Sequence, residues 1–301
     1  MAAIKKGINI WSFGAGRSLA DCLAIARAAG FEGIELVLSA RGELTPQSTP
    51  EEVRAIRRQA EAAGLQINSL ATGLFWHYSL TSDQPENRRR ACDLIRCLID
   101  TAALLGADTV LTCPGAVGVD FKPEDVVPDA EPGAFFTGSE VIDYEVCYER
   151  SLAAYRELAP YAGARQIVIG IENIWNKFLL SPLEMRDFID KIGSPWVAAF
   201  LDVGNVLQWG YPEQWIRILG PRIRKIHFKD YRRGLPSLAG FVDLLAGDVD
   251  WGKIYAELTR IGYDGWVNAE MCPTYRQYTD QIIYNASAAM DRILQRPVSK
   301  G

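Results

Sequence analysis

The chain has no paired cysteines, no excess of positive charge and no long apolar run. Its six cysteines form no C-x-x-C pair and fall mostly within helix-like or strand-like patterns, so we expect reduced structural thiols. Its 32 basic residues are outnumbered by 37 acidic ones, and the net charge of −5 argues against a nucleic-acid partner. No stretch approaches the roughly 18 uncharged apolar residues of a membrane-spanning helix, so no membrane partner is expected.

The first residues, MAAIKKGINIWSF, lack the apolar core and the small-residue cleavage site of a secretory signal peptide. We therefore expect a cytoplasmic protein. Hydrophobic residues make up 49% of the chain and charged residues 23%, which is ordinary for a soluble globular protein. A chain of 301 residues is long enough for one large α/β domain or two smaller ones.

One pattern repeats along the chain: an amphipathic segment ends in a glycine, and a short strand-like run follows at once. Glycine suits this place because the position just past a helix end often has a left-handed backbone. The pattern occurs at Gly30, Gly64, Gly106, Gly163, Gly193, Gly220 and Gly262. With the opening run GINIWSF, these seven joints predict eight strands separated by helices.

Three helix starts agree with this interpretation. Ser18, Thr49 and Ser181 each precede an acidic first turn, and proline follows Thr49 and Ser181 at the first helical position. Eight alternating strands and helices predict an α/β fold, a (β/α)8 TIM barrel formed as a single domain over residues 1–301. An open doubly wound sheet is the alternative, but WSFGAGRS after the first strand is too short for a Gly-rich phosphate turn.

One stretch interrupts the repeat. Residues 116–141, after the fourth predicted strand, are rich in proline, glycine and acidic residues. In a barrel they belong to the face at the carboxyl ends of the strands, where βα loops build active sites. A lid, an oligomer contact and a solvated insertion are all open interpretations.

Four successive predicted strands end in a titratable residue. The runs QIVIGIE, VAAFLD, IRKIH and GWVNAE end at Glu172, Asp202, His227 and Glu270. Burying an unpaired carboxylate costs several kcal/mol, so these four ends predict that the side chains converge. Hard oxygen donors with one imidazole predict one divalent ion, with Mn²⁺ preferred and Mg²⁺, Co²⁺ or Zn²⁺ as alternatives. The competing interpretation is four unrelated strand-end charges, each paired with Lys or Arg.

Six short motifs accompany these strand ends. They are GIEL (33–36), IEN (171–173), LDVGN (201–205), KIHFKD (225–230), GDVDW (247–251) and GYDGWVNAEM (262–271). Through them, nearly the whole chain resembles the xylose-isomerase-like sugar isomerase/epimerase superfamily. The nearest branch contains D-tagatose 3-epimerase and the L-xylulose-5-phosphate 3-epimerases. The resemblance implies a metal held by the four strand-end residues, with the two glutamates also acting as acid and base.

The chemistry of such a site follows from its groups. A divalent ion that chelates the carbonyl and hydroxyl oxygens of an α-hydroxyketone acidifies the C–H bond between them and stabilises an enediolate. Two carboxylates on opposite faces then exchange a proton, and the carbon inverts. The hypothesis is a metal-dependent epimerase or isomerase of a ketose, keto-sugar or sugar phosphate, with Glu172 and Glu270 as bases. The alternative is a lyase that uses the same proton abstraction for β-elimination from a 3-keto-glycoside or an inosose.

Two positions depart from the ketose 3-epimerase pattern. Asn205 stands where those enzymes carry a histidine, and Phe178 where they carry a second glutamate. An amide forms hydrogen bonds but cannot act as an acid near neutral pH. The identity of the substrate and the outcome of the reaction therefore depend on these two positions. The metal ligands are all present.

The loops that follow the predicted ligands supply candidates for binding the sugar. Arg233 lies six residues after His227, where the ketose 3-epimerases also carry an arginine, and Asn205 can hydrogen-bond a hydroxyl. Trp175 and Lys177 follow the first ligand, and an aromatic ring beside amine donors suits a sugar. For each residue except Asn205, a solvated or packed side chain is the competing interpretation.

Earlier strands add His77 and Glu35 as candidate pocket residues, and Lys229 and Asp230 are candidates for supporting the ligands. The expected partner is a small-molecule sugar, and a homo-oligomer, dimer or tetramer, is a further expectation. The superfamily also includes apurinic-site endonucleases, which need several metals and many histidines. Two histidines and a net charge of −5 argue against that activity.

Overall fold

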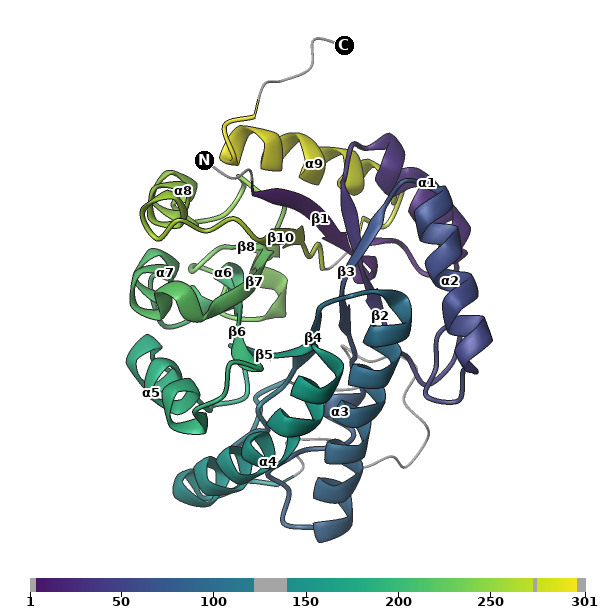
Figure 1. Cartoon of the computed structure of the whole chain (residues 1–301). Coiled ribbons are helices and arrows are strands. Elements are labelled where there is room, and N and C mark those ends of the chain that lie inside the picture. Colours follow the sequence, from purple (N-terminus) through teal and green to yellow (C-terminus); the bar gives the residue numbers. More distant parts are fainter. Residues whose placement is uncertain (1–3, 122–139, 273–274, 297–301) are drawn as a thin grey trace. The chain divides into compact units, whose positions relative to one another are not determined.

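The computed structural model describes residues 4–121, 140–272 and 275–296. Eight parallel strands form a closed barrel in the order β1-β10-β7-β6-β5-β4-β3-β2, and β8 and β9 form a separate antiparallel pair. Figure 1 shows the helices and strands coloured along the sequence. The strands are β1 (Lys5–Asn9), β2 (Gly33–Val37), β3 (Gln66–Ala71), β4 (Thr109–Thr112), β5 (Val168–Glu172), β6 (Val197–Asp202), β7 (Ile223–Phe228), β8 (Asp230–Tyr231), β9 (Phe241–Val242) and β10 (Trp266–Ala269). The helices are α1 (Leu19–Ala28), α2 (Pro50–Ala62), α3 (Pro85–Leu105), α4 (Tyr144–Arg165), α5 (Pro182–Ile192), α6 (Val203–Val206), α7 (Pro212–Leu219), α8 (Trp251–Arg260) and α9 (Gln281–Ile293). The predicted α/β barrel is confirmed.

The chain groups into two compact units. One comprises Met1–Leu36, Arg58–Asn68 and Phe200–Gly301, and the other comprises Val37–Arg57 and Ser69–Ala199. Strands β2, β3 and β6 each have residues in both units. In the second unit, α3 and α4 pack on each other, α3 on β4 and α4 on β5. In the first, β10 lies between β1 and β7, and α9 packs on it. The single-domain expectation for residues 1–301 stays a prediction.

The barrel strands are buried on both faces. Every residue of β4, β5 and β10 is buried, and Ile8, Ile34, Ile226 and Val267 have no exposed surface. Strands of this kind read as continuous apolar runs because neither face meets water. Any polar side chain within them therefore needs a partner in the protein.

Each of the eight predicted runs contains a strand, and some strand ends differ from the prediction. The first strand is shorter than predicted, because β1 stops at Asn9 and residues Ile10–Ser12 form a 3₁₀ turn. The Asn9 side chain accepts a hydrogen bond from the Trp11 N–H at 2.7 Å and so starts this turn. At the other end of the chain, β10 stops at Ala269, and Glu270 is the next residue.

Six of the seven predicted glycine joints adopt a positive φ. These are Gly30, Gly64, Gly106, Gly193, Gly220 and Gly262, with φ between +51° and +86°. The joint predicted at Gly163 is wrong. Helix α4 continues to Arg165, and Gln166 takes the left-handed position with φ 58°. Gly163 instead lies against Trp196, since a Cβ atom there would be 2.7 Å from the indole Cδ1 and Nε1.

The predicted helix caps are confirmed. The Ser18 hydroxyl accepts from the Asp21 N–H, and the Ser181 hydroxyl accepts from the Glu184 N–H, each at 3.2 Å. At the start of α2 the bonds are reciprocal, because Thr49 Oγ1 accepts from the Glu52 N–H and Glu52 Oε2 accepts from the Thr49 N–H. Helices α1, α2 and α5 thus begin where the sequence indicates.

The six cysteines are all free, as expected for structural thiols. Burial raises the pKa of the Cys113 and Cys147 thiols to about 12, so neither is a reactive thiolate at neutral pH. Within the described residues, no helix is long and apolar enough to cross a membrane. Residues 122–139 of the irregular stretch 116–141 lie outside the described residues.

The close contact between Gly163 and Trp196 predicts an unusual effect of an alanine substitution on stability. In a helix, Gly→Ala normally stabilises by up to about 1 kcal/mol. We expect Gly163→Ala instead to lower the free energy of unfolding by about 1–3 kcal/mol, because the new methyl group overlaps Trp196. Denaturant unfolding measures the change. Gly252→Ala in α8 is the control, because a Cβ there meets no atom closer than 3.5 Å. Equal stability of the two variants would contradict the packing argument.

Candidate metal centre

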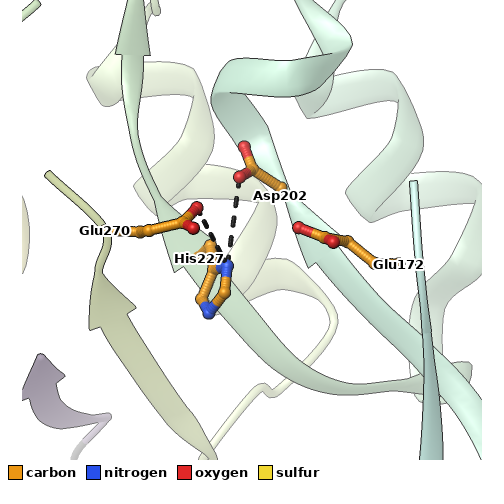
Figure 2. Close-up of side chains that lie close together, drawn as sticks. All are labelled: Glu172, Asp202, His227 and Glu270. Atoms are coloured by element: carbon orange, nitrogen blue, oxygen red, sulfur yellow. Dashed lines mark ion pairs between the residues drawn. The ribbon is translucent and has the colours of Figure 1, made fainter. Parts of the chain in front are cut away.

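The four predicted ligands lie together. Glu172 is the last residue of β5, Asp202 the last of β6, His227 the last but one of β7, and Glu270 follows β10. All four side chains are buried, and one ligand atom from each lies within 4.8 Å of the corresponding atoms of the others (Figure 2). The predicted convergence of these strand ends is confirmed.

The parallel register explains how these side chains meet. Asn268 of β10 pairs with His227 of β7, so Glu270 lies just beyond the end of that ladder. The Glu270 N–H donates to the Phe228 carbonyl at 3.1 Å and continues the ladder by one residue. The Ser12 hydroxyl accepts from the Met271 N–H at 2.8 Å, which fixes the backbone directly after Glu270.

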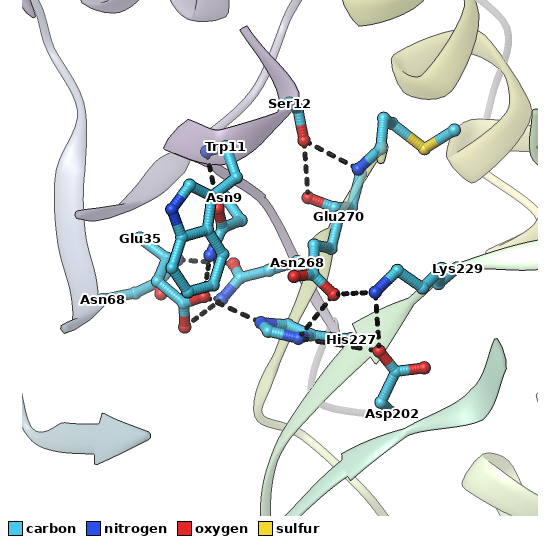
Figure 3. A network of polar contacts seen from close by, with 12 residues as sticks. Asn9, Trp11, Ser12, Glu35, Asn68, Asp202, His227, Lys229, Asn268 and Glu270 are labelled. Carbon is cyan, nitrogen blue, oxygen red and sulfur yellow. Dashed lines mark hydrogen bonds and ion pairs between the residues drawn. The ribbon is translucent and has the colours of Figure 1, made fainter. Parts of the chain in front are cut away.

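Lys229 brings a cation to the same carboxylates. Its Nζ lies 2.6 Å from Glu270 Oε2 and 3.5 Å from Asp202 Oδ2. His227 Nδ1 faces the same two oxygens, at 3.3 Å and 3.9 Å. Lys229 thus forms a direct ion pair with Glu270, as Figure 3 shows, and its predicted supporting role stays a prediction.

Burial and the neighbouring charges shift the pKa values of these groups in opposite directions. Burial raises the pKa of Asp202 to about 6, and the opposing effect of Lys229 is the smaller one. Burial also acts to raise the pKa of Glu270, but the ammonium of Lys229 and the imidazole of His227 outweigh it and lower the pKa. The pKa of Lys229 is raised by Glu270 and Asp202 despite its own burial.

The donor set fits a divalent cation. Three carboxylates and one lysine ammonium leave two negative charges in excess, and a dication balances them. Three hard oxygen donors and one imidazole nitrogen suit Mn²⁺ and its neighbours, whereas no thiolate is part of the group. Glu172, Asp202, His227 and Glu270 would therefore hold the ion.

Asn205 lies one turn after Asp202. Helix α6 begins at Val203, and the Asp202 carboxylate caps it by accepting from the Asn205 N–H at 2.8 Å. This bond fixes Asp202 Oδ1, while Oδ2 faces Lys229 and His227. The Asn205 side chain is buried, and its contact with a substrate stays a prediction.

Arg233 lines a pocket of about 170 Å³ together with Trp209 and Tyr211. Its Nη2 donates to the Gly210 carbonyl at 2.8 Å, and its guanidinium lies over the Tyr211 ring, 4.4 Å from the ring centre. Neither contact neutralises the positive charge. The predicted role of Arg233 in binding a sugar stays a prediction.

The other predicted sugar contacts have varied surroundings. Lys177 is exposed, and its Nζ forms an ion pair with Asp120 Oδ1 at 2.6 Å. Trp175 is half-buried and His77 is buried. Phe178 packs edge-to-face against Tyr144, Tyr148 and Phe188 in an aromatic cluster. Their roles toward a substrate stay predictions.

A polar network beside His227 escaped the sequence analysis, apart from Glu35. It contains the side-chain amides of Asn9, Asn68 and Asn268 and the carboxylate of Glu35. These amides are buried within strands or at their ends, but they carry no charge. A search for any polar residue in the buried strands, rather than for charged strand ends, would have found them.

Comparisons with known proteins agree with this architecture. A family model described as "Xylose isomerase-like TIM barrel" matches residues 23–290. A 2-epi-5-epi-valiolone 7-phosphate 2-epimerase from Actinoplanes sp. is 28% identical over 216 residues, which cover 70% of this chain and 67% of the relative.

Two solved structures are similar over nearly the whole chain. D-psicose 3-epimerase with D-tagatose from Clostridium cellulolyticum has a TM-score of 0.76 at 18% identity and covers 98% of this chain and 100% of its own. L-ribulose 3-epimerase has a TM-score of 0.75 at 20% identity and covers 98% and 95%. At these identities the two structures bear on the fold alone.

The charge of the cluster predicts that metal stabilises the protein. A ligand that binds only the folded state adds about 2.7 kcal/mol at about 100 times its Kd. We expect Mn²⁺ to raise the unfolding temperature of chelator-treated protein, and Asp202→Asn to abolish this rise, as measured by thermal denaturation. Asp187→Asn, at an exposed carboxylate of α5, is the matched control and keeps the rise. An undiminished rise with Asp202→Asn would contradict the assignment.

Proposed function

The chain belongs to the xylose isomerase-like TIM barrel family, and on that premise we propose that it is a divalent-metal-dependent sugar epimerase. The reaction moves a proton beside the carbonyl of a ketose, keto-sugar or sugar phosphate. The observation that carries the proposal is the buried group of three carboxylates and one imidazole. Such a group is costly to bury and has a chemical use when it holds a dication.

The bound ion would supply Lewis-acid polarisation of the substrate carbonyl. Asp202 and His227 are ligands in this proposal, and Glu172 and Glu270 are both ligands and bases. One glutamate removes the proton beside the carbonyl, and the other returns a proton to the opposite face of the resulting enediolate. A return to the neighbouring carbon by a single base would give aldose–ketose isomerisation instead.

The order of the barrel strands supports two distinct bases. Along the barrel, β10, β7, β6 and β5 are consecutive, so the strands that end at Glu270 and Glu172 are the outer two of the four. The strands of Asp202 and His227 lie between them. Inversion of a carbon requires two acid/base groups that approach the substrate from two sides.

The substrate contacts follow the same reasoning. We propose Arg233, Asn205, Trp175, Lys177 and His77 as residues that bind the sugar, since they follow strand ends of the barrel. The name of the Actinoplanes relative contains a 7-phosphate, which supports a phosphorylated keto-sugar among the candidate substrates. A soluble cytoplasmic enzyme that forms a dimer or tetramer is part of the proposal.

A lyase is the second candidate. The observation that favours it is the amide of Asn205, which is buried next to Asp202 and cannot act as an acid near neutral pH. An enzyme that removes a proton beside a ketone without returning it would allow a leaving group one carbon further on to depart. A 3-keto-glycoside or an inosose has such a leaving group.

A screen in D₂O separates the two reactions. Metal-loaded protein is incubated with ketoses, ketose phosphates and 3-keto-glycosides, and NMR follows the hydrogens beside each carbonyl. Deuterium incorporation without net elimination is the expected result. Release of an enone would identify the lyase instead, and no exchange with any compound would contradict both.

The two-base proposal predicts the effect of two substitutions. We expect Glu172→Gln and Glu270→Gln each to lower kcat by about 10²-fold or more, because an amide cannot accept the proton. Turnover of the best substrate from the screen is the measurement, with Mn²⁺ binding recorded in parallel. Glu61→Gln, at an exposed carboxylate of α2, makes the same change in charge and keeps wild-type turnover. A near-wild-type rate for either of the first two variants would show that its glutamate is not a base.

A further inference from the structure

Both ring nitrogens of His227 face carboxylate oxygens. While Nδ1 faces Glu270 and Asp202, Nε2 lies 2.7 Å from Glu35 Oε1 on the other side of the ring. Neither the His227 nor the Glu35 side chain has any exposed surface. Glu35 thus lies behind the imidazole as seen from the carboxylates, as Figure 3 shows.

The carboxylate of Glu35 is itself held by amides. Asn9 Nδ2 donates to Oε1, and Asn268 Nδ2 lies 3.5 Å from Oε2. The amides of Asn68 and Asn268 donate to each other at 2.8 Å and 3.0 Å, which fixes the orientation of Asn268. A side chain with this many directional contacts in a buried place has a defined position.

The register of neighbouring strands builds this network. Asn9 of β1 pairs with Glu35 of β2, and Asn268 of β10 pairs with His227 of β7. Gly7 of β1 pairs with Asn268, and a Cβ atom at Gly7 would lie 2.0 Å from Asn268 Oδ1. The amide pair therefore fits only because position 7 has no side chain.

We infer that Glu35 is a positioning residue, which holds His227 in the tautomer whose Nδ1 lone pair faces Asp202 and Glu270. This inference rests on the proposed metal site and adds a residue to it. Glu35 was expected to line the substrate pocket, and here its part is to orient a ligand.

The reason lies in the hydrogen-bonding capacity of the groups. An ionised carboxylate only accepts, so the ring nitrogen that faces Glu35 carries the hydrogen and donates it. A neutral imidazole has one N–H, which leaves Nδ1 free of hydrogen and able to bind a cation.

Carboxylates lie on both sides of the ring and compete for that hydrogen. The Nε2–Glu35 distance of 2.7 Å is that of a strong hydrogen bond, whereas 3.3 Å and 3.9 Å on the Nδ1 side are long for one. With Glu35 in place the hydrogen belongs on Nε2. Without it, the carboxylates of Glu270 and Asp202 would draw the hydrogen to Nδ1 and block the ligand position.

The tautomer is directly measurable because the chain has only two histidines, His77 and His227. In metal-free, ¹⁵N-histidine-labelled protein at alkaline pH, we expect the His227 signals of an Nε2–H ring. This measurement needs no variant, so it does not depend on the folding of a mutant. A wild-type His227 that is predominantly Nδ1–H would overturn the inference.

A substitution tests the consequence for the metal. Glu35→Gln introduces an amide that can donate as well as accept, so it no longer fixes the hydrogen on Nε2. We expect Mn²⁺ affinity, measured by calorimetry on chelator-treated protein, to fall by about 10-fold to 100-fold, with the stoichiometry unchanged. The tautomer signals of this variant should shift toward Nδ1–H.

Glu32→Gln is the matched control. It makes the same change in charge three residues earlier, where Glu32 pairs with Arg296 and accepts from the Lys6 N–H. Its Mn²⁺ affinity should stay within about twofold of the wild type, because it does not touch His227. Equal affinities of the two variants would overturn the inference while leaving the metal site in place. A wild-type protein that binds no Mn²⁺ would overturn the proposed function as well.

Discussion

Buried negative charge has to be balanced where it is buried, and this constraint governs the region around His227. Asp202, Glu270 and Glu35 surround the imidazole and are at most 6% exposed. Leaving one such carboxylate without compensation costs several kcal/mol, a substantial part of the free energy that keeps a domain folded. A cluster of this kind persists only because cations and donors are arranged around it.

Two adjacent residues provide much of that arrangement. Lys229 directs its ammonium to Glu270 and Asp202, while the next residue, Asp230, turns to the loop between β9 and α8. Its carboxylate accepts from the N–H groups of Tyr231, Leu245, Gly247 and Val249 and from the Trp251 indole, at 2.9–3.2 Å. Five donors surround this buried carboxylate, and four of them connect β8, which begins at Asp230, to residues 245–251. The predicted role of Asp230 in supporting the ligands stays a prediction.

The sequence predicted the barrel and the four-residue cluster because both depend on local signals. A strand buried on both faces has no local reason to end in a carboxylate, and successive parallel strands place their ends together. Contacts between segments that lie far apart in the chain are more weakly indicated by the sequence. Glu35 ends a strand as the ligands do, and only the structure tells on which side of the His227 ring it lies. Gly163 matches the pattern of a helix end, whereas its actual role depends on Trp196, 33 residues later. Asn268 is neutral and therefore gave no sign of a charge that needed compensation.

Charge balance also bears on where an anionic group of a substrate would bind. A phosphate gains little by approaching the cluster. The three carboxylates of Glu172, Asp202 and Glu270 already match the charges of Lys229 and a dication. It needs a cation elsewhere. Lys177 is poorly suited, since its exposed ammonium already lies 2.6 Å from the carboxylate of Asp120. Arg233 is better suited, because a carbonyl oxygen and an aromatic ring leave its charge in place, and a planar guanidinium forms paired hydrogen bonds to phosphate oxygens. A preference for phosphorylated sugars would therefore depend on Arg233 more than on Lys177.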